Sequence, residues 1–157
     1  MTLADLANIG EILGAVAVLV TLVYLAVQIR QGSATARAQT RQALADSQIN
    51  YLNSRVTDPF LRDTFFKITS GQEIDEAEGL AYRVHVTAHI RLFENYFTQY
   101  TLGTMNAEDW RAMRAVIRAQ FKLEPYQEAF YFREEIWNSN FTAEVKNIIG
   151  ELGESAA

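Results

Sequence analysis

Residues 9–27 read IGEILGAVAVLVTLVYLAV, and this apolar run governs how the rest of the chain is interpreted. It contains one charged residue, Glu11, close to its start. A helix of about 20 residues rises about 30 Å, which matches the hydrocarbon thickness of a bilayer. A buried helix of a soluble domain normally carries polar residues at intervals, and this run does not. We therefore predict a transmembrane helix within residues 1–29, with a short outer N-terminus.

Two alternatives compete with an uncleaved span. A cleaved signal peptide needs a basic start and a small-residue exit, whereas Asp5 and Asn8 precede this run and VYLAVQIRQ follows its centre. A fully buried helix in a soluble oligomer is the second alternative. The missing basic start and the lack of polar interruptions favour the uncleaved transmembrane helix over both.

The charges are distributed unevenly along the chain. Lys and Arg number 14 against 19 Asp and Glu, and the net charge of −5 argues against general affinity for nucleic acid. No basic residue precedes the run, whereas Arg30, Arg37 and Arg41 follow it before the next acidic residue. Basic flanks stay in the cytoplasm, so we expect the N-terminus outside and a cytoplasmic C-terminal domain. The same three arginines are candidate membrane-surface residues, with the lipid bilayer as partner.

The apolar run continues into a stretch that favours a helix. Residues 30–57 are rich in Ala, Gln and Arg and contain no Pro, so we expect the membrane helix to extend to about Val56. Gly32 is the one weak point. This segment is interpreted as a basic juxtamembrane extension of the helix.

Small and polar residues recur at seven-residue spacing along this helix. In lipid, helices associate where small residues let their backbones approach closely, so the pattern predicts a homo-oligomer. Chance remains an alternative, because Gly and Ala are common in membrane helices. The predicted association seam consists of Ala7, Gly10, Gly14, Ala17, Thr21 and Gln28, and its spacing continues through Tyr24, Gln31, Thr35, Ala38, Gln42 and Ala45.

Residues 58–150 contain the start and stop signals of several short helices. No segment alternates at period two, and apolar residues recur at spacings of three and four. We therefore predict an all-α protein, in which one long N-terminal transmembrane helix continues into an antiparallel cytoplasmic helical domain with a frayed tail over 151–157. The expected helix starts are Asp58-Pro59, Asp75 with Glu78 as a capping box, Asn106, Pro125 and Thr142.

Two histidines are the strongest candidates for metal chemistry. His85 and His89 lie four residues apart on one predicted helix, a spacing that can direct two imidazoles at one metal ion. No HExxH motif surrounds them, and the chain has no cysteine. Ordinary helix histidines are the favoured interpretation. We predict no catalytic residue and no cofactor.

Other polar groups have structural interpretations. Arg91 and Glu94, three residues apart, are expected to pair, as part of a network that orients helices or, alternatively, of a polar pocket. The remaining basic cluster is expected to form a solvated helix face, with an anion site as the alternative; it consists of Arg111, Arg114 and Arg118.

The start LADLANIGEILGAVAVLVTLVYLAVQIRQ, together with RLFENYFTQYTLGTM and Trp110, resembles a recurrent group of small bacterial membrane proteins of uncharacterised activity. The resemblance implies a single N-terminal span, a helical domain and a bacterial inner-membrane location. It implies no catalytic residue.

Three hypotheses of function follow. The first is a membrane-anchored, self-associating interaction or scaffold protein with a cytoplasmic protein partner. The alternative is a pore or channel-like homo-oligomer, with Glu11, Thr21 and Gln28 as polar positions. A second alternative is a metal- or ligand-binding sensor or enzyme that uses His85 and His89.

Overall fold

A computed structural model describes residues 3–154; the surroundings of residues 3–7, 9, 10 and 12 are not described. No strand occurs within that range, so the predicted all-α class is confirmed. The helices are α1 (Leu3–Thr57), α2 (Pro59–Thr69), α3 (Glu76–Thr101), α4 (Ala107–Gln120), α5 (Glu124–Phe132) and α6 (Ser139–Glu154), with a short 3₁₀ turn at Glu134–Ile136 before α6.

The chain divides into two compact units, Met1–Gln39 and Thr40–Ala157. We expected the helical domain to begin at residue 58, so the observed boundary lies within the predicted juxtamembrane extension. The reason is packing: Leu44 is 4% exposed and belongs to the core of the second unit. The segment Thr40–Thr57 of α1 is therefore part of the helical unit.

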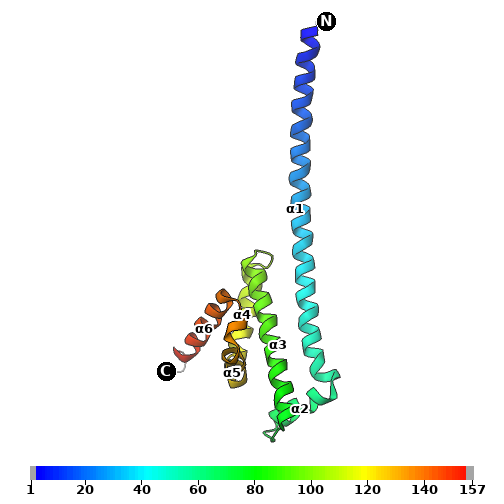
Figure 1. Cartoon of the computed structure of the whole chain (residues 1–157). Helices are drawn as coiled ribbons and strands as arrows, with labels where there is room; N and C mark the ends of the chain where they lie inside the picture. Colours follow the sequence, from blue (N-terminus) through cyan, green and yellow to red (C-terminus); the bar gives the residue numbers. More distant parts are fainter. Residues whose placement is uncertain (1–2, 155–157) are drawn as a thin grey trace. The chain divides into compact units, whose positions relative to one another are not determined.

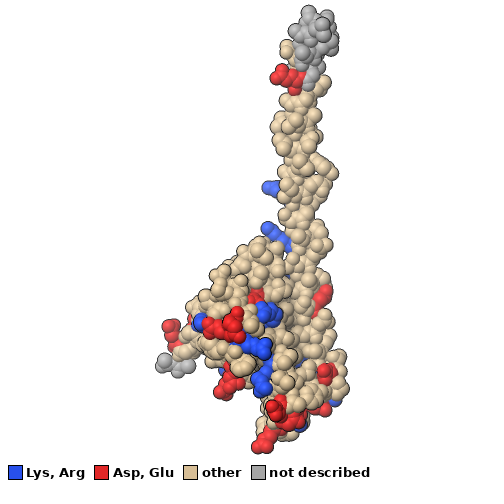
Figure 2. Space-filling model, in the orientation of Figure 1, with Lys and Arg blue, Asp and Glu red and all other residues tan. Residues whose placement is uncertain are grey.

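The first unit presents apolar side chains to its surroundings. From Leu13 onward α1 is long and apolar enough to cross a membrane by length and composition, and none of its apolar window is buried. Figure 2 shows a stretch of this helix without charged side chains, between an acidic group and the first basic ones. An exposed apolar surface of this kind is typical of a segment that contacts lipid or another protein.

The helix starts of the second unit follow local sequence signals. Asp58 accepts hydrogen bonds from the amides of Phe60 and Leu61, with Pro59 at the first helical position. Asp75 forms the predicted capping box with Glu78, and Asn106 accepts from the amide of Asp109. These three predictions are confirmed.

The last helix begins earlier than predicted. It starts at Ser139 instead of after Thr142, because the Asn138 side chain accepts hydrogen bonds from the amides of Asn140 (2.9 Å) and Phe141 (3.4 Å). Thr142 therefore lies inside α6. The helix continues through residues 151–154 of the predicted tail, and residues 155–157 lie outside the described range.

The core of the second unit surrounds α3. Apolar residues at the predicted helical spacing are buried on α3 (Val86, Ile90 and Phe93) and on α4 (Trp110 and Ile117). Helices α4, α5 and α6 pack against α3 (Figure 1). The segment 40–57 of α1 runs antiparallel to α3, as two contacts show: Leu44 lies beside Tyr96, and further along α1 Tyr51 lies beside His85.

Candidate functional site

Both histidines lie in a buried aromatic cluster between helices. His85 and His89 of α3 are 6% and 3% exposed. The ring of Tyr51, from α1, stacks on both imidazoles, with centroid distances of 4.2 Å and 4.1 Å. Tyr126 of α5 reaches His89 from another direction, with its hydroxyl 2.6 Å from Nδ1. Helices α1, α3 and α5 therefore meet at this pair, which we call the histidine cluster.

Arg55 determines the state of His85. Its Nε donates a hydrogen bond of 3.0 Å to His85 Nε2, which must therefore be the unprotonated nitrogen of a neutral ring. The guanidinium group also donates to the Tyr51 hydroxyl (2.8 Å) and lies over the Phe65 ring, 4.5 Å from its centroid. This half-buried cation is stabilised by ring faces and by neutral acceptors. His85 is thus an acceptor in a structural network.

Burial and charge both keep the two imidazoles neutral. Burial, assisted by the positive charge of Arg55, lowers the pKa of His85 from 6.5 to about 4. The same two causes, with a smaller contribution from His85, lower the pKa of His89 to about 3. Burial also raises the pKa of the Tyr126 hydroxyl. At neutral pH both imidazoles of the histidine cluster are therefore uncharged, and the adjacent Arg55 carries the positive charge.

This geometry does not assemble a metal centre in the described part of the chain. No group of three His, Asp or Glu side chains able to hold a metal ion occurs there. The Nε2 lone pair of His85 is directed at a guanidinium cation, which also repels a second cation. Glu78, two turns before His85 on α3, pairs with Lys67 at 2.6 Å. In the sequence, the two histidines were recognised by their spacing alone. No sequence motif indicated the other members of the site, which come from distant segments: Tyr51, Arg55 and Tyr126.

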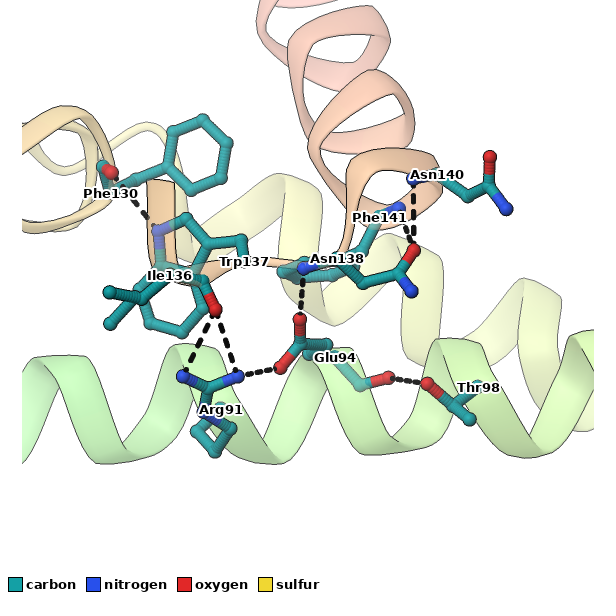
Figure 3. Close-up of polar contacts among 9 residues, drawn as sticks. All are labelled: Arg91, Glu94, Thr98, Phe130, Ile136, Trp137, Asn138, Asn140 and Phe141. Carbon is teal, nitrogen blue, oxygen red and sulfur yellow. Dashed lines mark hydrogen bonds and ion pairs between the residues drawn. The ribbon is translucent and has the colours of Figure 1, made fainter. Parts of the chain in front are cut away.

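The predicted pair of Arg91 and Glu94 is present and joins α3 to the start of α6 (Figure 3). Glu94, 7% exposed, also accepts a hydrogen bond of 2.5 Å from the amide of Asn138. Arg91 donates to the Ile136 carbonyl and lies over the Trp137 ring, 4.6 Å from its centroid. The arrangement is therefore the predicted orienting network.

A shallow polar groove adjoins this network. Its volume is about 700 Å³, and it is lined by Ser47, Ala88, Arg91, Leu92, Glu94, Asn95, Thr98 and Asn138. The carboxylate of Glu94 already accepts hydrogen bonds from Arg91 and from the Asn138 amide. Neither Arg91 nor Glu94 therefore offers the groove a free charge for binding a ligand.

The prediction that the basic residues of α4 form a solvated face is partly wrong. Arg114 forms ion pairs of 2.6 Å with Glu144 and with Glu151, both on α6. These hydrogen-bonded carboxylates raise the pKa of the guanidinium group. Sequence reasoning missed the bridge because both acidic partners lie at least 30 residues away.

The structure also places the predicted membrane residues. Seam positions Gly14, Ala17, Thr21 and Gln28 are exposed, whereas Ala7 and Gly10 lie among the residues whose surroundings are not described. Of the arginines, Arg30 and Arg37 are exposed. Arg41 is exposed as well, and it also forms an ion pair with Asp109 at the start of α4, which partly neutralises its charge.

An apolar groove of about 960 Å³ lies between α3 and α5. Its apolar walls include Leu80 and Val84 on one side and Phe132 on the other, which are 56%, 61% and 80% exposed. Arg83, Glu128 and Arg133 contribute charges of both signs. The groove is larger than the polar groove beside Glu94.

No protein-family model, no curated protein and no solved structure matches this sequence or its fold.

Proposed function

We propose that this chain is a membrane-anchored, self-associating interaction or scaffold protein. One observation carries the proposal: between residues 13 and 29 of α1 all large apolar side chains are exposed, among them Leu13 (64%), Val20 (64%) and Val27 (45%). At about 25 cal/mol per Å² of apolar surface, leaving such a helix in water is costly, and lipid removes the cost. A single-pass anchor therefore accounts for the surface.

The flanking charges support one orientation. Arg30 and Arg37 are exposed and follow the apolar stretch, whereas Glu11 stands near its start. Basic residues remain on the cytoplasmic side, so we propose an external N-terminus, a cytoplasmic helical unit and a location in the bacterial inner membrane. Arg41 contributes less to this effect, since Asp109 partly neutralises it.

The exposed seam supports self-association. A Cβ added at Gly14 would meet no other atom of the chain within 4 Å, so no packing within the chain requires a small residue there. Close approach of a second helix is a reason for such a residue in lipid. Thr21, on the same seam, donates its hydroxyl to the Ala17 carbonyl at 2.9 Å. This hydrogen bond satisfies the Thr21 hydroxyl, for which lipid offers no partner. Thr21 therefore gives no support to the alternative of a polar pore at this position.

The histidine cluster gives little support to the sensor or enzyme alternative. Both imidazoles are buried, and their one charged neighbour is a cation. A cytoplasmic protein partner finds better support in the apolar groove between α3 and α5.

Membrane extraction tests the anchor. After an alkaline carbonate wash, we expect the full chain to remain in the membrane pellet and to need detergent for release. Recovery in the supernatant as a single species without detergent would refute the proposal.

Orientation is tested with single cysteines, since the natural chain has none. Both Asn8 and Ser70 are exposed in the structure. We expect a membrane-impermeant maleimide to label Asn8→Cys in intact spheroplasts and Ser70→Cys only after permeabilisation. The reverse pattern would overturn the orientation.

Association is tested by co-purification of two differently tagged copies. Gly14→Leu places bulk on the seam and is expected to reduce the co-purified fraction, because backbones can no longer approach. Ala15→Leu is the matched control, next to the seam and also exposed. Equal co-purification of both variants would contradict the seam.

A further inference from the structure

Within the helical unit, the segment 40–57 of α1 has one face that packs against α3. Leu44 is buried and accepts a hydrogen bond from the Tyr96 hydroxyl at 3.1 Å. Tyr51 stacks on the histidines, and Arg55 donates to His85. These residues, spaced seven and four apart, attach the segment to α3.

A neighbouring face of the same segment carries large apolar side chains that nothing covers. Ile49, Leu52 and Val56 are 54%, 47% and 68% exposed. Their spacings of three and four place them in one stripe along the helix. A soluble surface tolerates single exposed apolar residues, but a stripe of three at helical spacing is typical of a helix interface.

We propose that this stripe is the interface of a parallel, two-stranded coiled coil between two copies of the chain. The proposal rests on the self-association proposed above and specifies its geometry and copy number. Copies anchored in one membrane share one orientation, so their α1 helices leave the span in parallel. The stripe of one copy then faces the same stripe of the other.

The register of the sequence supports a second copy as the occupant. The seven-residue pattern of the seam reaches Gln42 and Ala45, and its next positions are Ile49, Leu52 and Val56. In heptad terms, Ile49 and Val56 occupy a positions and Leu52 occupies a d position. β-Branched residues at a with Leu at d favour two parallel strands over three or four.

Charges beside the stripe agree with a parallel pair. Arg41 and Asp46 occupy the g position and the following e position, which meet across a parallel coiled coil. Both side chains are exposed, Arg41 by 68% even with its ion pair to Asp109. Opposite charges at these positions favour parallel helices in register.

Disulfide crosslinking in native membranes tests the proposal on the full, otherwise cysteine-free chain. Ile49→Cys and Leu52→Cys place thiols on the stripe, and Asn50→Cys, exposed but off the stripe, is the matched control. After mild oxidation we expect both stripe variants to yield mainly covalent dimer, several-fold more than the control. Only a parallel pair in register brings identical residues together at both positions.

A seam variant distinguishes failure of this inference from failure of the proposed function. Crosslinking of Gly14→Cys without crosslinking at the stripe would overturn the coiled coil and leave self-association standing. Absence of crosslinks at all three positions would refute both. Stripe crosslinking no stronger than that of Asn50→Cys would mean that another protein or the membrane covers the stripe, and it too overturns the inference.

The native mass in mild detergent tests copy number. We expect two chains of 17.8 kDa each, and a reduction to one chain in the Ile49→Glu/Leu52→Glu variant. A mass above two chains would overturn the two-stranded assembly. Because both residues are exposed, this variant should keep the buried tryptophans of the core in place, which fluorescence checks.

Discussion

Acidification should destabilise the helical unit through its two histidines. In the folded chain the pKa of His85 is about 4 and that of His89 about 3, against an ordinary value of 6.5. Burial is the larger cause and the charge of Arg55 the second. Tyr51 and Tyr126 also contact the pair, and burial raises the pKa of the Tyr126 hydroxyl. Unfolding releases both imidazoles into water, where they take up protons.

The sign and size follow from proton linkage. Below pH 6.5 the unfolded chain binds protons that the folded chain excludes, so stability is full above that pH and falls as the pH drops towards 4 and 3. Each histidine contributes about 1.4 kcal/mol per pH unit in that window. Going from pH of about 7.5 to about 5, we expect the free energy of unfolding to fall by about 2–4 kcal/mol for the pair. Carboxylates with ordinary pKa values near 4 change little over this range.

Tryptophan fluorescence provides the assay. Trp110 and Trp137 are 7% and 6% exposed and lie in the core of the helical unit, so urea unfolding of the full chain in mild detergent changes their emission. The free energy of unfolding is measured at several pH values between about 7.5 and 5. His89→Phe keeps an aromatic ring against Tyr51 and removes one titration, so about half of the pH dependence should disappear.

Two results would refute this reasoning. One is a free energy of unfolding that stays constant from neutral pH to about 5. The other is a His89→Phe variant that retains the full pH dependence of the natural chain. Either would mean that the imidazoles are not held neutral by burial and Arg55.

Three substitutions test the packing of the helical unit in the same unfolding assay. Glu94→Ala removes the acceptor of the Asn138 amide and of Arg91 and should cost about 2 kcal/mol, whereas the exposed Glu73→Gln should cost less than about 0.5 kcal/mol; equal values would contradict a structural role of this carboxylate. Phe93→Ala empties a fully buried site and should cost about 3–5 kcal/mol, and a cost similar to that of the 65% exposed Phe66→Ala would disprove the assigned core. Gly103→Ala forces a side chain into a backbone with φ of 73° and should cost about 1 kcal/mol, and unchanged stability would contradict that turn geometry.

Local signals in the sequence predicted the secondary structure well. Caps such as Asp58 and Asp75 act on amides two or three residues away, so their partners are visible in the sequence. The stripe of α3 is visible for the same reason, since its period is that of the helix itself. The start of α6 was misplaced where two candidate caps compete, Asn138 and Thr142. The Asn138 side chain accepts from the amides of Asn140 and Phe141, so the helix begins at Ser139 and Thr142 lies inside it.

The candidate site was predictable only in part. The pairing of Arg91 with Glu94 follows from their spacing on one helix. The second use of Glu94, at the Asn138 amide 44 residues away, has no signal in the sequence. The same holds for Arg114, whose two acidic partners lie on another helix.

By itself, the sequence determined the helical class, the apolar stretch after Glu11 and the punctuation of the short helices, because these depend on side-chain polarity and on interactions within one turn. Tertiary structure alone decided that Thr40–Thr57 belongs to the helical unit and that His85 accepts a hydrogen bond from Arg55. It also decided which face of α1 remains uncovered. These outcomes depend on contacts between segments 30 or more residues apart, and the position of such contacts is set by how whole helices pack, which no local pattern encodes.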